Sequence, residues 1–274
     1  MSSFSILNNI PALQAENNLN NTQTELNTTL QQLSSGQRIN SGSDDPAGLA
    51  IANGLQANIS ALNQSAQNAN DGVGALQVAD GALSQVTTLL NSAVTIATEA
   101  STGTVSSAQR NALEAEYTQI LAEIDRIGST TTFNGTSVFT ASTTSVYLSD
   151  GNSSSTIGVS VGALSSTALA LGTTTLAGTD GSAAQTALTA INAAIATVAG
   201  DRGTIGASVN RLQDASAVIN IQVQNLTAAE NGILSADIPT VISNLSQQSV
   251  LEQTGEAALA QANSQEQSVL KLLQ

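Results

Sequence analysis

The stretch LQANISALNQSAQNANDGVGALQVADGALSQVTTLLNSAVTIA, residues 55–97, repeats apolar residues in an alternating four-three spacing. Asp80 and Thr87 are the two interruptions of the series, whose members are Leu55, Ile59, Leu62, Ala66, Ala69, Val73, Leu76, Asp80, Leu83, Thr87, Leu90, Val94 and Ala97. A heptad pattern of this length predicts a long helix that packs along a partner helix. At about 1.5 Å per residue, the helix is expected to be on the order of 60–70 Å long.

A second stretch with the same spacing lies far downstream, and Arg202 and Ser216 interrupt it. Its positions are Ala184, Leu188, Ile191, Ile195, Val198, Arg202, Ile205, Val209, Leu212, Ser216, Ile219, Val223 and Leu226. Two matching heptad stretches at opposite ends of one chain predict an antiparallel helix pair. Residues 106–127 read as a shorter helix with its apolar residues on one side, and it would be the third member of a bundle.

Residues 128–181 change to serine, threonine, glycine and alternating apolar residues, as in Thr144–Leu148 and Thr156–Val161. This residue composition and alternation are typical of strands and turns. We expect β-hairpins here that cap one end of the helical rod. The fold class is therefore mainly α, a long antiparallel coiled-coil bundle with a small β-hairpin region in the middle of the chain.

Two terminal segments lie outside this bundle, and each is amphipathic. One carries leucines at 19, 26, 30 and 33, and the other runs from about Val241 to the carboxyl end with apolar residues at 245, 259, 269, 270, 272 and 273. Neither segment can bury its apolar face alone. A run of turn-forming residues from Ser34 to Gly48 joins the amino-terminal segment to the long helix.

Composition excludes several classes of function. Twenty acidic and six basic residues give a net charge of −14, with no basic run, so neither nucleic acid nor an anionic membrane is expected as a partner. The chain has no Cys and no His, which removes thiol nucleophiles and the commonest general base and metal ligand. We therefore expect no enzymatic activity, no cofactor and no metal site.

No membrane insertion is expected either, because no uninterrupted apolar stretch approaches the roughly 18 residues that span a bilayer. Residues 1–13 lack the basic and apolar regions of a cleavable signal. Export would therefore use a route without such a signal.

One long motif connects the chain with a known family. The sequence LSSGQRINSGSDDPAGLAI at residues 33–51 resembles the amino-terminal signature of bacterial flagellins. Residues 123–127 followed by Phe133-Asn134-Gly135 resemble the end of the family's second core helix and the turn into its hairpin. Residues 260–263 and 268–274 resemble its terminal helix, so the resemblance covers roughly residues 1–140 and 180–274.

The resemblance implies a subunit that polymerises into an open helical filament for swimming motility, with no catalysis. It assigns residues 1–35 and 235–274 to helices that pair in an inner tube, 36–54 to a connector, 55–128 and 182–234 to core helices, and 129–181 to a variable hairpin region. Inner-tube contacts fall to Leu19, Leu26, Leu30, Leu33, Leu259, Val269, Leu270 and Leu273. Implied partners are other copies of the chain, the flagellar type III export apparatus, a chaperone, the filament cap and the hook-junction proteins. Family members leave the cell unfolded and fold on assembly.

The motif also nominates connector residues for polymerisation, namely Arg38, Ile39, Asn40, Asp44, Asp45 and Pro46. Arg38 lies near Asp44 and Asp45 in the sequence, so an ion pair within or between subunits is one hypothesis, and a solvated charge is the alternative. The two aspartates could suggest a metal site, but a turn role before Pro46 fits better, because neither further carboxylates nor histidines are nearby.

Core-helix contacts are assigned to Glu116, Asp125 and Arg126, where Arg126 forms either an intersubunit contact or an ordinary helix salt bridge. Some flagellins are recognised by Toll-like receptor 5 through an Arg, a Leu and a Glu, and these align with Ser92, Ile96 and Glu116. Because the Arg is lost, we expect weak receptor activation.

Two other functions compete with the filament subunit. A hook-filament junction protein would share the terminal helices and part of the motif. A secreted coiled-coil adhesin would need an anchor or a binding module, and the sequence suggests neither.

Overall fold

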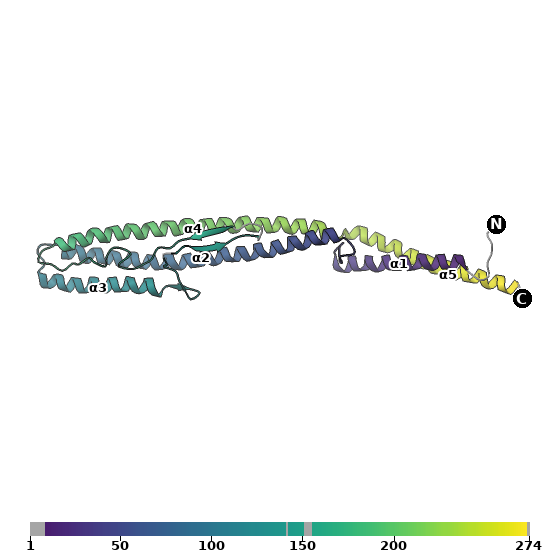
Figure 1. Ribbon diagram of the computed structural model, residues 1–274, viewed down its shortest axis with the longest axis horizontal. Coiled ribbons are helices and arrows are strands. Elements are labelled where there is room, and N and C mark those ends of the chain that lie inside the picture. The colour runs from purple at the N-terminus through teal and green to yellow at the C-terminus, as the bar shows by residue number, and fades with distance from the viewer. Residues whose placement is uncertain (1–8, 141, 151–154, 273–274) are drawn as a thin grey trace. The chain divides into compact units, whose positions relative to one another are not determined.

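The computed structural model describes residues 9–140, 142–150 and 155–272, which form two compact units. Of the described residues, unit 1 comprises those from 9 to 57 and from 225 to 272, and unit 2 comprises those between 58 and 224. The helices are α1 (Ile10–Ser35), α2 (Pro46–Ala100), α3 (Ser107–Thr130), α4 (Ser182–Leu234) and α5 (Ile238–Leu272) (Figure 1). The mainly α fold class with a small hairpin region is confirmed.

Two short antiparallel hairpins lie between α3 and α4. The first joins β1 (Thr132–Phe133) to β2 (Thr136–Ser137) through a two-residue turn, and the second joins β3 (Thr144–Tyr147) to β4 (Thr156–Val159). Asn134 and Gly135 form the first turn with φ of 48° and 77°, the left-handed values that such tight turns require.

Within unit 2, α2 and α4 pack antiparallel, as the two heptad stretches predict. A Cβ at Gly72 of α2 would lie 3.1 Å from the Leu212 side chain of α4, and Asp80 pairs with Arg202 further along. Residue numbers therefore rise along α2 as they fall along α4. Asp80 and Arg202 are each an interruption of their apolar series, and the structure brings these two interruptions together.

About half of the positions in each predicted heptad series are buried as expected. At part of the remaining positions, the buried residue is the one directly before the predicted one. Within unit 2, every seventh residue is at most 5% exposed, at 62, 69, 76, 83, 90 and 97 in α2 and at 184, 191, 198, 205, 212 and 219 in α4, whereas Leu55 and Leu226 at the outer ends of the two series are half-buried. The alternate α2 positions predicted at 66, 73, 80, 87 and 94 are only half-buried, and Ser65, Ala79, Val86, Ala93 and Ala100 are buried instead. In α4, Ala187 and Ala194 likewise replace 188 and 195.

The third helix, α3, packs against an extended segment, residues 160–181, that has neither helix nor strand. Asp125 accepts hydrogen bonds from the amide and hydroxyl of Ser166 at 2.6 and 2.8 Å, and the Tyr117 hydroxyl contacts the Thr174 hydroxyl at 2.6 Å. This segment buries its own apolar core, namely Val161, Leu164, Leu169, Leu171 and Leu176. Burial of the Tyr117 phenol raises its pKa above the ordinary value.

The prediction that the hairpins cap an end of the bundle is wrong. Hairpin β3–β4 lies beside α2 and α4 (Figure 1), where the Ser65 hydroxyl donates to the Ser149 carbonyl at 2.9 Å and Asn68 Nδ2 donates to the Tyr147 carbonyl at 3.2 Å. A Cβ at Gly72 would lie 3.0 Å from Val146. A two-stranded hairpin cannot bury an apolar face alone, and the small residues of α2 provide the surface that covers it.

Within unit 1, α1 and α5 pack antiparallel. Asn9 Nδ2 donates to Glu266 Oε2 at 3.0 Å at one end, and the Ala236 amide donates to the Gly36 carbonyl at 3.0 Å at the other. The described residues that these helices bury are few and mostly small, with Ala12 and Thr29 in α1 and Val241 in α5. The pair is therefore held by a thin seam.

Among the described residues, α4 is long enough and has a high enough mean hydropathy to cross a membrane. Core helices of soluble proteins often share these two properties. In unit 2, α4 buries every seventh residue and carries an ion-paired arginine, so the fold accounts for its apolar composition.

Candidate assembly site

The end of α1 and the start of the connector are fixed by backbone hydrogen bonds within unit 1. Gly36 ends α1 in a left-handed conformation with φ of 68°, and its amide donates to the Gln32 carbonyl. The Arg38 amide donates to the Leu234 carbonyl at 2.6 Å, and Gln37 forms a β-bridge with Ser235. The connector is thus tied to the α4–α5 turn.

Arg38 does not pair with Asp44 or Asp45. Its guanidinium donates to the Ile233 carbonyl at 3.0 Å, near the carboxyl end of α4. A cation at this end of a helix is favourable because the last carbonyls lack partners and carry the negative end of the helix dipole. The arginine of the motif therefore acts as a cap for α4.

Asp44 and Asp45 serve the backbone, as the turn hypothesis expects. Asp44 Oδ2 accepts from the Asn40 and Ser41 amides at 2.9 and 2.8 Å. Asp45 Oδ1 accepts from the amides of residues 47 and 48 at 3.1 and 2.9 Å, and Pro46 occupies the first helical position. The helix therefore begins at Pro46, and the connector ends at residue 45 rather than 54.

Electrostatics and packing both hold this turn in place. Hydrogen bonds from the Asn40 and Ser41 amides lower the pKa of Asp44 below its ordinary value. Ile39 is 3% exposed and packs against Gly48, where a Cβ would lie 2.8 Å from the isoleucine side chain. Asn40 Nδ2 donates to the Gln37 carbonyl at 3.0 Å, so each motif residue has a local structural role.

Large apolar side chains remain exposed on unit 1. Among the described residues, eight of the twelve exposed large apolar side chains belong to it, namely Ile10, Leu13, Leu30, Ile51, Ile238, Ile242, Val250 and Leu251. Of the leucines nominated for inner-tube contacts, Leu30 is 44% exposed, whereas 19, 26, 33 and 259 are half-buried. Val269 and Leu270 lie in α5, and Leu273 lies outside the described residues.

The nominated residues of α3 differ in their surroundings. Arg126 forms a bidentate, exposed ion pair with Glu123 at 2.6 and 2.7 Å, which lowers the pKa of Glu123. Asp125 instead holds Ser166 of the extended segment. Glu116 is exposed. In this chain Arg126 thus makes an ordinary helix salt bridge, and Asp125 has an internal structural role.

The receptor-equivalent positions lie in unit 2. Ser92 is exposed, and its hydroxyl donates to the Thr88 carbonyl of its own helix at 3.3 Å. Ile96 is 7% exposed, so its side chain contributes to the core of unit 2 rather than to the surface. Glu116 is the one of the three that combines an exposed position with the expected residue type.

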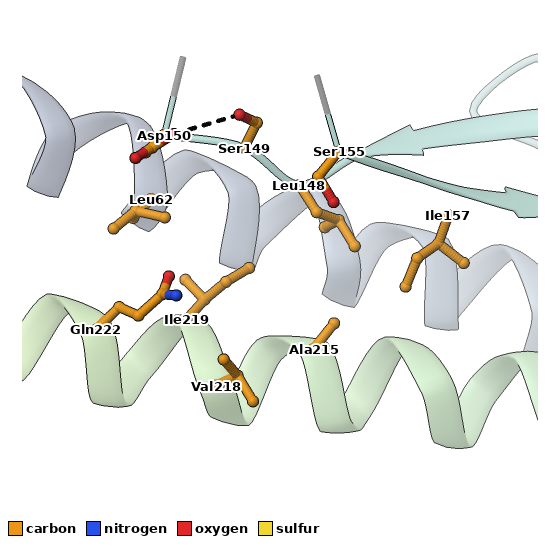
Figure 2. Close-up of a pocket in the computed structure, with 10 residues that line it drawn as sticks. All are labelled: Leu62, Leu148, Ser149, Asp150, Ser155, Ile157, Ala215, Val218, Ile219 and Gln222. Carbon is orange, nitrogen blue, oxygen red and sulfur yellow. Dashed lines mark hydrogen bonds between the residues drawn. The ribbon is translucent and has the colours of Figure 1, made fainter. Parts of the chain in front are cut away.

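A hollow of about 390 Å³ open to solvent lies between the second hairpin, α2 and α4 (Figure 2). Its aliphatic lining includes Leu62, Leu148, Ile157 and Ile219, and Asp150 is its charged lining residue in the described part of the chain. Ser149, Ser155 and Gln222 add polar but not ionisable side chains, so the described lining offers a single carboxylate and no acid-base pair.

One buried cation was not predicted from the sequence. Arg110 is 2% exposed and donates to the carbonyls of Ala100, Thr102 and Thr179 at 2.8, 3.0 and 3.4 Å. It joins the end of α2 to the start of α4. A cation in the first turn of a helix is unfavourable, so its position at the start of α3 could have indicated a partner elsewhere.

This architecture is that of a self-associating structural protein. The chain is helical and has few charges, and its terminal helices leave large apolar side chains exposed. Comparison with known proteins identifies the family. The family model for the bacterial flagellin N-terminal helical region matches residues 6–144, and that for the C-terminal helical region matches residues 188–273.

Relatives support the same assignment over nearly the whole chain. A flagellin of Halalkalibacterium halodurans is 34% identical over 98% of this chain and 99% of its own, and one of Xenorhabdus nematophila is 34% identical with the same coverage. The protein in a crystal structure of Bacillus cereus flagellin is 30% identical in sequence to this chain. The match covers 60% of this chain and 94% of that one, with a TM-score of 0.49. The chain belongs to the bacterial flagellin family and is a structural subunit of the extracellular flagellar filament that serves motility.

Proposed function

We propose that the subunit polymerises through unit 1, with α1, α5 and the connector as the contact surface. The observation that carries this proposal is the set of eight exposed large apolar side chains on that unit. Exposed apolar side chains of this number favour association: these eight are 37–63% exposed, and burying the exposed part of each contributes on the order of 1 kcal/mol. A repeated contact between different surfaces of identical subunits gives an open helical filament.

The thin seam between α1 and α5 supports a coupling between assembly and folding. Helices with so little buried surface gain their main packing partners from neighbouring copies, so ordering and polymerisation occur together. In this proposal residues 1–35 and 235–274 form the inner-tube helices, and the shorter connector at residues 36–45 belongs to the same contact surface.

The proposal also includes the finer partners that the family resemblance implies. The chain leaves the cell unfolded through the flagellar type III apparatus, a chaperone covers the apolar face of the carboxyl segment, and assembly occurs at the cap beyond the hook-junction proteins. The exposed Ile242, Val250 and Leu251 of α5 supply a surface for such a chaperone.

A pair of matched valines tests the polymerisation surface. Val250 in unit 1 is 59% exposed, and Val218 in unit 2 is 53% exposed. Val250→Ser is expected to raise the critical concentration for filament growth from seeds about tenfold, because about 1.4 kcal/mol of contact free energy is lost. Val218→Ser controls for the substitution itself. Electron microscopy and sedimentation measure the growth, and a larger effect of Val218→Ser would contradict the proposal.

Weak recognition by Toll-like receptor 5 completes the proposal. The exposed Ser92 lacks a cation, and Ile96 is buried, so two of the three receptor contacts are missing. A reporter-cell assay with purified monomer is expected to show a poor response. Strong activation at trace concentrations would contradict this part of the proposal.

A further inference from the structure

Three Asn-Gly dipeptides occur in the chain, at Asn53-Gly54, Asn134-Gly135 and Asn231-Gly232. Asparagine followed by glycine is the dipeptide most prone to deamidation, since glycine has no side chain to hinder attack by its amide nitrogen. All six residues are exposed to solvent. Exposure therefore does not distinguish the three sites, and any difference between them must come from the backbone.

The backbone differs strongly between the sites. Asn53 lies inside α2 and Asn231 lies in the last turn of α4, where the glycine amide donates to the carbonyl four residues earlier. Asn134 and Gly135 instead form the tip of the first hairpin, outside its ladder. That ladder has two residue pairs, Thr132 with Ser137 and Phe133 with Thr136. Opening so short a ladder costs less free energy than opening a long helix.

We propose that Asn134 is a site of spontaneous deamidation in the assembled subunit. The Gly135 amide nitrogen loses its proton and attacks Cγ of Asn134, so that a carbon-nitrogen bond closes a succinimide ring. The bond from Cγ to the side-chain nitrogen breaks, and ammonia leaves. Water then opens the ring at Cγ to give aspartate, or at the main-chain carbonyl to give isoaspartate. The reaction needs only water.

The two products have different structural consequences. Aspartate tolerates the left-handed conformation at φ of 48° nearly as well as asparagine, so the turn is kept and gains one negative charge. Isoaspartate lengthens the main chain by one carbon and disrupts the two-pair register. The Phe133 ring, which would lie 3.5 Å from a Cβ at Gly74 of α2, then loses its fixed position. Because the subunit lies in an extracellular filament, product accumulates for as long as the filament persists.

The three sites provide their own internal controls. Filaments of the full chain are incubated in mildly alkaline buffer, which speeds the deprotonation step, and tryptic and further digests are analysed over time by mass spectrometry. We expect Asn134 to convert at least about tenfold faster than Asn53, with Asn231 between them because helix ends open more readily than helix interiors. A synthetic peptide of residues 129–140 gives the rate without structure.

Two results of this time course would overturn the proposal: conversion at Asn53 or Asn231 as fast as at Asn134, or no product at Asn134 while the free peptide converts fully. A third would be an acidic shift on ageing that is as large in the variant Asn134→Gly as in the wild type. In Asn134→Gly the side-chain amide is absent, and glycine accepts the positive φ. Isoelectric focusing of aged wild-type subunits is expected to show an acidic shift, and Asn134→Gly is expected to lose most of it.

Discussion

Replacing Gly128 with alanine tests the packing of the extended segment against α3. In a helix this exchange ordinarily stabilises a protein by up to about 1 kcal/mol, because glycine loses more conformational freedom. Here a Cβ would overlap the Leu164 carbonyl oxygen, which is backbone and cannot rotate away. The structure therefore predicts that the ordinary sign of the effect is reversed.

The size of the stability change depends on how far the segment near Leu164 must move to make room for the new Cβ. Relief of the overlap displaces the segment near Leu164, which is 7% exposed, and strains the two hydrogen bonds between Ser166 and Asp125. Overpacking of this kind costs about 1–3 kcal/mol, and each strained hydrogen bond adds up to about 1 kcal/mol. After the gain in helix propensity, we expect Gly128→Ala to lower the free energy of unfolding by about 2 kcal/mol.

The matched control is Gly81→Ala in α2, where a Cβ meets nothing within 4 Å. This variant is expected to be more stable than the wild type by about 0.5–1 kcal/mol. Urea unfolding of monomers at low concentration, followed by circular dichroism and by tyrosine fluorescence, measures both variants. If Gly128→Ala proved as stable as Gly81→Ala, the described contact between α3 and residues 160–181 would be refuted.

Three further predictions concern charged residues. Arg110→Ala leaves the carbonyls at the end of α2 without their buried cation, and urea titration is expected to show that the free energy of unfolding falls by about 2–4 kcal/mol. A loss below about 1 kcal/mol would argue against a stabilising role of these hydrogen bonds. A double-mutant cycle on Asp80 and Arg202 is expected to give a coupling of about 1 kcal/mol or less, since both side chains are over a third exposed, and the charge-exchanged pair should recover part of it. The hydrogen bond from Arg202 lowers the pKa of Asp80, so its contribution is present above the ordinary aspartate pKa and is lost as pH falls through the lowered value; Asp80→Asn should remove this part of the acid-side loss in unfolding experiments. An acid-side profile unchanged by Asp80→Asn would contradict that assignment.

The helices could be predicted from the sequence because their period is long and regular. Within unit 2, every seventh residue of both stretches is buried, so the antiparallel pairing of α2 and α4 followed directly. The alternate positions could not be resolved, because small residues such as Ala79 and Ala93 can be buried next to the larger, half-buried Asp80 and Val94. How closely the two helix backbones approach, rather than side-chain hydrophobicity, determined which of the two neighbouring residues faced the partner helix.

The connector and the middle of the chain were less predictable. The turn residues around Asp44 were clear, but the helix start at Pro46 depends on Asp45 capping the amides of residues 47 and 48. The position of the hairpins beside the helices depends on long-range contacts such as Ser65 with Ser149. Sequence spacing contains no information on such contacts, and the extended segment 160–181 has no period at all.

The middle of the chain is attached to the helices at two separate places. The second hairpin is held on α2 by Ser65 and Asn68, and the extended segment is held on α3 by Tyr117 and Asp125. A change in the length of the connection between β3 and β4 therefore leaves the attachment of the extended segment to α3 untouched. Such a division lets that connection diversify rapidly in evolution, and it offers a point where a foreign peptide could be displayed along a filament.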